Sequence, residues 1–123
     1  MLVVKTQLKE FKGKGIGLIA SEFIKKGQKV WIFNPVIDIL IDKKSLPKKA
    51  RDFYKIYAVE YRKNKIAFNT DNARFINHSK NPNIKSLGDF KPNIAIRDTK
   101  KGEEITIDYS TIDINPINFK VVQ

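Results

Sequence analysis

The sequence contains no cysteine and a single histidine. Disulfide bonds, thiolate metal sites and a cysteine nucleophile are therefore excluded, and we expect no metal centre. No apolar run approaches the about 18 residues that a membrane-spanning helix needs, so we expect no membrane association. The absence of disulfides favours an intracellular location: the cytoplasm, or the nucleus if the source is eukaryotic or the protein acts in a host cell.

Length and composition indicate one folded domain. The chain has 123 residues, of which 41% are hydrophobic and 30% charged. It is too apolar for general disorder and large enough to bury one hydrophobic core. We find no linker and no low-complexity tract, so we expect the domain to span residues 1–123.

Positive charge is in excess, and much of it is local. The formal net charge is +11, and residues 43–65 carry nine cationic and two acidic side chains. Such a basic face could attract nucleic acid, an acidic protein or an anionic membrane. A solvated helix face that keeps the protein soluble is the more common explanation, and charge alone names no partner.

Short runs rich in isoleucine, valine and phenylalanine, separated by glycine, proline or asparagine, indicate a mainly β fold. Near the end of the chain Ile105, Ile107 and Tyr109 alternate with polar residues, as a half-buried strand requires. The candidate strands are residues 2–8, 17–20, 28–33, 36–41, 65–69, 93–97 and 104–109.

One segment has helical periodicity instead. Ser45 suits an N-cap and Pro47 suits the first turn of a helix. Apolar residues then recur at the i, i+3, i+4, i+7 spacing of an amphipathic helix, with lysines and arginines mainly on the other side. The apolar face would comprise Ala50, Phe53, Tyr54, Tyr57, Ala58 and Tyr61.

Three stretches are not used up by this account of strands and turns. They are GKGIGLIA at residues 13–20, RFINHSKNPN at 74–83 and GEEITIDYS at 102–110. Taken singly, each has an ordinary interpretation: a glycine turn, a loop with Asx-turns around the histidine, and a strand with a buried tyrosine. No clear helix follows the glycines, which argues against a dinucleotide or phosphate-binding loop.

Taken together and in this order, the three stretches resemble the SET domain family of protein lysine methyltransferases. The match covers roughly residues 3–110, so the chain is similar to a minimal SET domain. The resemblance implies a β-clip-like fold of several small sheets with a C-terminal pseudoknot, in which the tail at residues 110–123 closes the site. The matching residues are Gly15-Ile16-Gly17, then Arg74-Phe75-Ile76-Asn77-His78-Ser79 with Pro82-Asn83, then Gly102-Glu103-Glu104-Ile105-Thr106 with Asp108-Tyr109.

The same resemblance implies S-adenosylmethionine as the methyl donor. In this scheme Asn77 contacts its amino and carboxylate end, backbone at His78 meets its adenine, and Tyr109 stands at the methyl-transfer centre as the catalytic residue. His78 would then matter through its position and backbone more than through its imidazole. The implied cofactor-binding residues are Gly15, Ile16, Gly17, Arg74, Phe75, Asn77, His78 and Tyr109.

Aromatic side chains are expected to line a narrow channel for the substrate lysine and to attract its charged methylated product. The candidates are Tyr54, Tyr57, Tyr61 and Phe119, although plain core packing would explain each one singly. The chain also departs from the family pattern. Lys80 stands where many members have cysteine, the tail has no cysteine for zinc, and Ile16 stands where some members place an aromatic residue. We therefore expect Phe119 to help close the channel.

Two functions remain open at this point. The first is an S-adenosylmethionine-dependent protein-lysine N-methyltransferase acting on a lysine-bearing protein substrate. The second is a non-catalytic module of the same fold that docks on nucleic acid, chromatin or an acidic protein through its basic face. The positive field should repel strongly basic peptides, so an acidic or mixed recognition surface on the substrate is expected. An oligomer would be compatible with a channel that a partner helps to finish.

Overall fold

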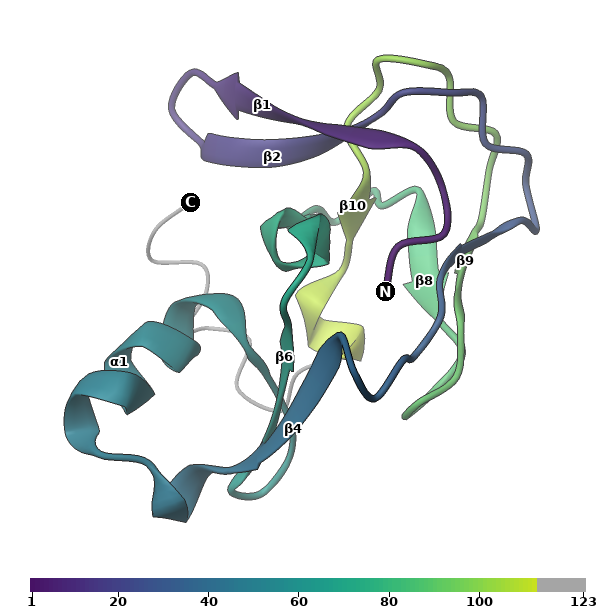
Figure 1. Cartoon of the computed structure of the whole chain (residues 1–123). Helices are drawn as coiled ribbons and strands as arrows, with labels where there is room; N and C mark the ends of the chain where they lie inside the picture. The colour runs from purple at the N-terminus through teal and green to yellow at the C-terminus, as the bar shows by residue number, and fades with distance from the viewer. Residues whose placement is uncertain (113–123) are drawn as a thin grey trace.

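The computed structural model describes residues 1–112. Within these residues, short strands form four small sheets, and one α-helix lies at the edge of the molecule (Figure 1). The mainly β fold of several small sheets that the sequence predicts is therefore confirmed.

Of the six strand pairings within residues 1–112, three join consecutive strands and three join strands that are not consecutive in the sequence. An antiparallel hairpin consists of β1 (Thr6–Phe11) and β2 (Gly15–Ala20). Two sheets have three antiparallel strands each. The first has the strand order β3 (Lys29–Trp31), β9 (Asn93–Ala95), β8 (Ile84–Ser86). The second has the strand order β4 (Asp38–Asp42), β6 (Lys65–Asn69), β5 (Val59–Arg62). The fourth pairs β7 (Asn77–His78) in parallel with β10 (Thr106–Ile107). Three short 3-10 helices are η1 (Lys43–Ser45), η2 (Asn72–Phe75) and η3 (Tyr109–Thr111).

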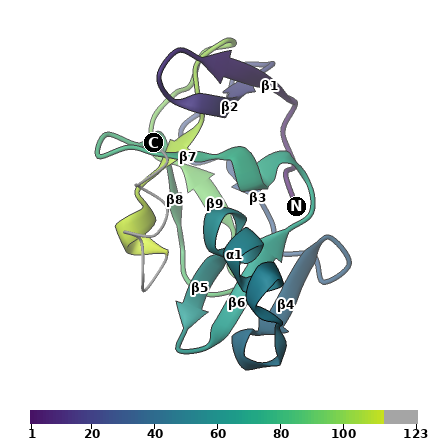
Figure 2. The same ribbon diagram turned by 90° about the vertical axis from the view of Figure 1, so that its left-hand side faces the viewer.

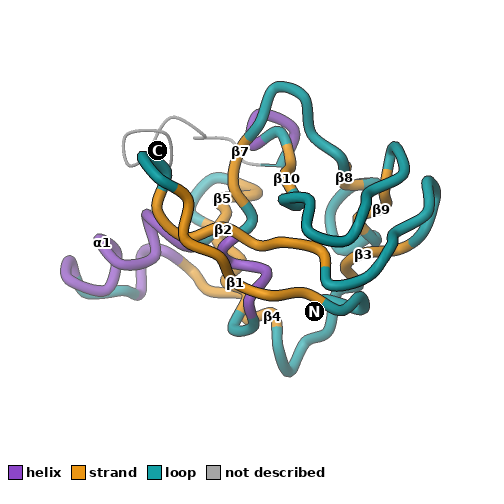
Figure 3. The backbone as a smooth tube through the Cα atoms, turned by 90° about the horizontal axis from the view of Figure 1, so that it is seen from above, coloured by secondary structure: helices purple, strands orange, loops and turns teal. Residues whose placement is uncertain are grey.

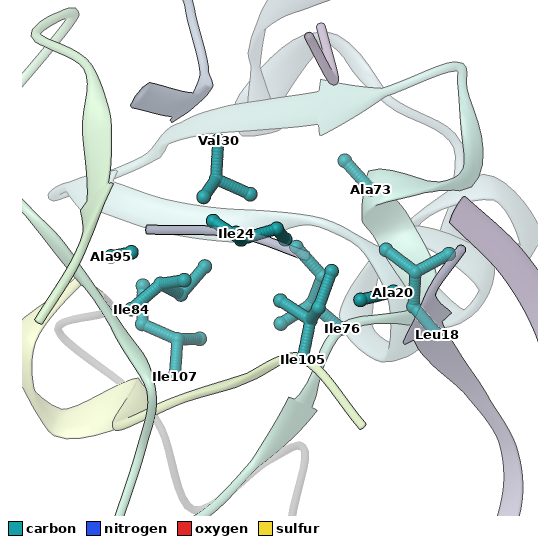
Figure 4. Close-up of a cluster of buried hydrophobic side chains, with 10 residues drawn as sticks. All are labelled: Leu18, Ala20, Ile24, Val30, Ala73, Ile76, Ile84, Ala95, Ile105 and Ile107. Carbon is teal, nitrogen blue, oxygen red and sulfur yellow. The ribbon is translucent and has the colours of Figure 1, made fainter. Parts of the chain in front are cut away.

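One cluster of buried side chains draws on β2, β3, η2, β8, β9 and β10 (Figure 4). Each fully buried aliphatic side chain contributes about 1.5–3 kcal/mol relative to exposure. The core thus holds in place the strands that carry all three sequence motifs. Its members are Leu18, Ala20, Ile24, Val30, Ala73, Ile76, Ile84, Ala95, Ile105 and Ile107.

The last described strand is held between two other segments. Ile105 N donates to the Leu18 carbonyl at 2.7 Å, and Ser79 N donates to the Ile107 carbonyl at 3.0 Å. Figure 3 shows β7 and β10 side by side. The predicted strand at 104–109 is thus shortened to β10, and Ile105, Thr106 and Ile107 are all buried instead of alternating. The pseudoknot remains a prediction, because its tail lies outside the described residues.

Asn83 joins this strand to the loop after β7. It is fully buried; its Nδ2 donates to the Glu104 carbonyl at 2.9 Å, and its Oδ1 accepts from Thr106 N at 2.9 Å. Asn83→Ala leaves both backbone groups without these partners. We expect a loss of about 3 kcal/mol of unfolding free energy and a melting temperature lower by about 10 °C. Thermal unfolding followed by circular dichroism measures this, with exposed Asn81→Ala as the control; equal effects of the two variants would contradict the prediction.

The helix is shorter than its periodicity predicts. α1 (Lys48–Tyr57) has Pro47 as its N-cap residue, without a side-chain cap, and Ser45 belongs to η1. The predicted cap at Ser45 is wrong because a residue before proline avoids the helical region, and Leu46 is extended at φ −90° and ψ 135°. Tyr61 lies in β5 beyond the helix. Figure 2 shows α1 beside the β4, β6 and β5 sheet, and no helix within residues 1–112 is long and apolar enough to cross a bilayer.

Candidate active site

The glycine stretch and the asparagine–histidine stretch meet at Asn77. The Asn77 side chain is buried, and its Nδ2 donates to the Ile16 carbonyl at 3.3 Å and to Glu104 Oε2 at 2.8 Å. Gly17 is packed so tightly here that a Cβ would lie 2.6 Å from Glu104 Oε2 and 2.9 Å from Asn77 Nδ2. All three motifs therefore contribute to one corner of the molecule, which we call the Asn77 corner: Lys14, Ile16, Gly17, Asn77 and Glu104.

Lys14 and Glu104 bring opposite charges to the Asn77 corner. Lys14 Nζ lies 2.5 Å from Glu104 Oε1, with the Glu104 side chain 13% exposed and the Lys14 side chain 37% exposed. An ammonium, a carboxylate and an amide in one place complement the carboxylate and ammonium of an amino acid. Neither charged residue is among the site residues predicted from the sequence, although each lies inside a motif, and charge within the motifs is the signal that points to them.

His78 fixes the backbone at Tyr109. Its Nδ1 accepts a hydrogen bond from Tyr109 N at 3.1 Å, and the two rings lie 5.3 Å apart. In the neutral imidazole an accepting Nδ1 places the proton on Nε2. Asp108 Oδ1 is 3.7 Å from the same nitrogen and accepts from Ser110 N, so Asp108 also caps η3. The imidazole thus has a structural role, the positioning of the Tyr109 backbone, that was not predicted from the sequence.

The Tyr109 hydroxyl has a defined orientation. It donates to the carbonyl of Ile76 at 2.7 Å. Ile76 is the residue before Asn77 in the second motif. Because the hydrogen points toward Ile76, the hydroxyl oxygen acts as an acceptor toward any further group. Tyr109 is held at both its backbone and its phenol by the second motif, so its ring has little freedom to move.

A small pocket of about 60 Å³ adjoins Tyr109. We call it the Tyr109 pocket. Its lining includes Tyr57, as predicted for the channel, and also Trp31 and Ile56, which the sequence did not indicate. Arg74 is the one charged side chain among its described lining residues. The glycine stretch, Asn77 and His78 are not part of this lining. Tyr109 links the two regions, because it lines the pocket and also contacts His78.

The other predicted channel residues lie elsewhere. Tyr54 is in neither described pocket and packs against Phe68, with ring centroids 5.1 Å apart. Tyr61 lines a second pocket, which we call the ring pocket. Phe119 lies outside the described residues. Of the three candidates within residues 1–112, the structure brings Tyr57 into the Tyr109 pocket and places Tyr54 and Tyr61 elsewhere.

Arg74 and Phe75 form part of η2 beside this pocket. Arg74 Nη1 donates to the Thr70 carbonyl at 2.9 Å and to the Asp71 carbonyl at 3.2 Å, and its guanidinium stacks 4.6 Å above the Phe75 ring. Phe75 in turn contacts Tyr57, at 6.0 Å between ring centroids. Their predicted part in cofactor binding stays a prediction. No group of three or more ionisable side chains suited to a metal ion occurs among residues 1–112.

Solved structures with the same fold include three that differ in length. A Plasmodium falciparum protein provisionally described as a histone methyltransferase has 24% identity and a TM-score of 0.61, over 86% of this chain and 93% of that one. A Neurospora SET domain protein, a histone lysine methyltransferase, has 23% identity and a TM-score of 0.61, over 88% and 53%. An autoinhibited Chaetomium thermophilum Polycomb Repressive Complex 2 bound to S-adenosylmethionine has 21% identity and a TM-score of 0.66, over 93% and 16%.

At these identities the structural matches establish the fold alone, and the chain spans about half of the Neurospora protein. No curated protein matches the sequence significantly. The SET domain family model matches residues 15–110, a range that contains the Asn77 corner apart from Lys14, and also His78 and Tyr109. The chain therefore belongs to the SET domain family.

Proposed function

We propose that the protein is an S-adenosylmethionine-dependent protein-lysine N-methyltransferase. The observation that carries this proposal is Tyr109, which lines a small pocket, has a hydroxyl oriented by the Ile76 carbonyl, and has its backbone held by a hydrogen bond to His78, the residue next to Asn77. A module that only docks on other molecules would need neither feature. Membership of the family and the methyltransferases among the structural neighbours support the same assignment.

The Asn77 corner suits the methionine part of S-adenosylmethionine. Lys14 would bind the carboxylate, Glu104 would bind the ammonium, and Asn77 would donate from its amide. On binding, Lys14 and Glu104 would replace their ion pair at 2.5 Å with contacts to the ligand. When bound, S-adenosylmethionine supplies a methyl group on a positively charged sulfur. One structural neighbour carries this molecule, which supports the assignment.

The contribution of this chain to methyl transfer would be alignment. Transfer is an in-line displacement, so the protein must hold the acceptor amine and the methyl group in one direction and need not provide a nucleophile. The Tyr109 oxygen, an acceptor by its orientation, would receive weak C–H···O contacts of about 0.5–1 kcal/mol each or an N–H from the amine. Trp31, Tyr57 and Ile107 would exclude water around the lysine stem.

A lysine must be neutral to accept a methyl group, and with a pKa of about 10.4 only about 0.1% of it is neutral near pH 7.4. The Arg74 guanidinium, with no carboxylate in the described lining of the Tyr109 pocket, would lower that pKa. We expect Arg74→Gln to move the rising limb of the pH profile of kcat, which reports groups in the enzyme–substrate complex, to higher pH and to lower kcat at pH 7.4 by about three- to tenfold.

Two variants separate charge from structure in that experiment. Arg74→Lys keeps the charge but loses the planar guanidinium, and it should retain the original pH profile. Arg51→Gln removes a charge from exposed α1 and should leave the profile unchanged. If Arg74→Lys and Arg74→Gln shift the profile equally, the charge of Arg74 has no part in deprotonation.

Calorimetric titration with S-adenosylmethionine, followed by transfer of labelled methyl to proteins of a cell lysate, tests the proposed function directly. We expect saturable binding with one site and label on lysine. A failure to bind S-adenosylmethionine would contradict the proposed enzymatic function. Mass spectrometry of the labelled proteins would then identify the substrate, for which we propose an acidic or mixed surface because the field of the chain is positive.

A docking module is the second candidate function, and the basic segment favours it. No side chain of α1 is fully buried, and six cations of residues 43–65 form no ion pair within the described part of the chain: Lys44, Lys48, Lys49, Arg51, Lys55 and Lys63. If docking on nucleic acid were the function, log K would fall against log salt with a slope of about −0.9 per phosphate contacted. Retention on DNA with such a slope and no cofactor binding would favour this candidate.

A further inference from the structure

The ring pocket adjoins the Tyr109 pocket. Its volume is about 280 Å³, against about 60 Å³ for its neighbour. The two share Trp31, Val59, Asn69, Asn93 and Ile112 in their linings. A polypeptide whose lysine entered the Tyr109 pocket would therefore pass over the ring pocket with an adjacent part of its chain.

Four aromatic rings form a continuous wall in the ring pocket. The ring centroids are 6.4 Å apart from Trp31 to Phe33, 5.0 Å from Phe33 to Phe90 and 5.5 Å from Phe90 to Tyr61, and all three pairs are tilted well away from parallel. Such an arrangement offers ring faces to a cation, which the ring quadrupole attracts.

The charged groups of the ring pocket are acidic. Asp38 and Asp89 belong to its described lining, which contains no lysine or arginine, although the whole chain carries a net charge of +11. Asp89 pairs with Arg62 at 3.3 Å, but both side chains are largely exposed, and such pairs exchange partners readily. Asp38 is paired with the Met1 ammonium at 2.7 Å. The described lining of the ring pocket therefore lacks the excess of positive charge that the whole chain carries.

Two buried polar atoms of this lining have no hydrogen-bond partner within the described part of the chain: Asp38 Oδ1 and Trp31 Nε1. The Asp38 residue is 1% exposed, and its other oxygen accepts from Met1 N at 2.7 Å and Asn34 N at 2.8 Å. Buried polar groups ordinarily have partners, so residues 1–112 leave these two atoms with unused hydrogen-bonding capacity. One unused acceptor and one unused donor thus lie in the wall of the ring pocket, both covered by protein atoms.

Phe90 has an unusual backbone conformation. Its φ is +62°, in the left-handed region that bulky residues avoid, and its side chain is 46% exposed. Strained residues of this kind persist mainly at sites of function. The conformation places an exposed ring between Phe33 and Tyr61, where it completes the wall.

We propose that the ring pocket binds an arginine side chain of the substrate polypeptide close to the lysine that is methylated. This inference rests on the proposed function and names one feature of its substrate. The guanidinium stacks on ring faces and pairs with carboxylates, which suits this wall and these two aspartates better than a lysine ammonium would. The Tyr109 pocket carries a cation and favours a neutral amine, whereas the ring pocket accepts the charge.

The first test needs no catalysis. The chain contains one tryptophan, so its indole N–H gives a single resonance, and Trp31 lies in both pockets. Titration with N-acetyl-arginine methylamide at millimolar concentrations should shift this resonance saturably, with weaker effects for the lysine analogue and none for the leucine and glutamate analogues. No shift with arginine, or an equal shift with leucine, overturns the proposal even if the protein methylates lysine.

The second test uses peptides with one lysine and a neighbouring position occupied by arginine, lysine, leucine or glutamate. We expect the arginine peptides to have a KM about tenfold lower than the leucine peptides at the preferred position. Asp89→Asn and Phe90→Gly should remove this preference without lowering kcat on the leucine peptides. Phe90→Gly also relieves the φ of +62°, so a fold defect is not expected.

Matched controls lie outside the ring pocket. Asp52→Asn removes an exposed carboxylate from α1, and Phe23→Ala removes a ring that is 55% exposed. Both should keep the arginine preference, and Phe90→Ala should lose it as Phe90→Gly does. If the controls lose the preference as fully as the ring-pocket variants, the site assignment is wrong. If no peptide is methylated, the proposed function fails, while the indole titration still decides what the ring pocket binds.

Discussion

Tyr109→Phe is expected to lower the rate of methyl transfer about 100-fold, because a misplacement of about 1 Å in a reacting group costs this much. The substitution removes the oxygen that would accept from the methyl group or the amine. It also removes the hydrogen bond to the Ile76 carbonyl, at 2.7 Å, that sets the direction of the phenol. The ring and its contact with His78 remain, so the affinity for S-adenosylmethionine should change little.

Single-turnover transfer of labelled methyl and calorimetric titration with S-adenosylmethionine together measure this result. Tyr54→Phe is the matched control, since Tyr54 is a partly buried tyrosine outside both described pockets. The lost hydrogen bond should cost about 1 kcal/mol of unfolding free energy, which circular dichroism can follow. An unchanged transfer rate would remove Tyr109 from the mechanism, and a change in the number of methyl groups added would show that the hydroxyl limits the space at the amine.

Gly17→Ala is expected to weaken S-adenosylmethionine binding by about tenfold to 100-fold, the equivalent of the 1–3 kcal/mol that overpacking costs. A Cβ at this position would lie 2.6 Å from Glu104 Oε2, 2.8 Å from Phe11 Cε2 and 2.9 Å from Asn77 Nδ2. These neighbours must move apart, and two of them are the polar groups proposed to hold the ligand.

Gly13→Ala is an informative control, because glycine is required at position 13 by the backbone conformation and at position 17 by the close packing of its neighbours. Gly13 has φ +77°, and within the described part of the chain no atom beyond its immediate neighbours would lie within 4 Å of a Cβ there. Alanine at this position therefore strains the backbone without filling any occupied space. It should lower the melting temperature slightly and leave cofactor binding intact. Calorimetric titration of both variants with S-adenosylmethionine measures the two affinities. Unchanged affinity of Gly17→Ala would show that the Asn77 corner does not bind the cofactor.

Much of the candidate site could be predicted from local sequence. Through their resemblance to the SET domain family, the three motifs imply that Gly17, Asn77 and Tyr109 belong to one site, and the structure brings their segments into contact. The strand predicted at residues 65–69 has the bounds that the structure shows. The strand prediction succeeds because β-branched runs and turn residues are properties of short segments, whereas the roles of the site residues rest on the family resemblance and stay predictions.

The helix and the channel show where local pattern fails. Pro47 moves the start of α1 past Ser45, and Tyr61 leaves the helical face to join β5. Tyr54 and Tyr57 are three residues apart on the same helix, yet Tyr57 reaches the Tyr109 pocket while Tyr54 packs against Phe68. Periodicity tells which side of a helix is apolar, but it does not tell which cavity each apolar residue meets.

The sequence by itself determined the family, the mainly β class and the residues at which methyl transfer is proposed. Only the tertiary structure decided that Lys14 and Glu104 join Asn77, that Arg74 gives the Tyr109 pocket its charge, and that Asp38, Trp31 and Phe90 meet in the ring pocket. The physical reason is that burial, pairing and pocket charge are set by distances between segments far apart in the chain. A sequence pattern constrains only the neighbours within one segment.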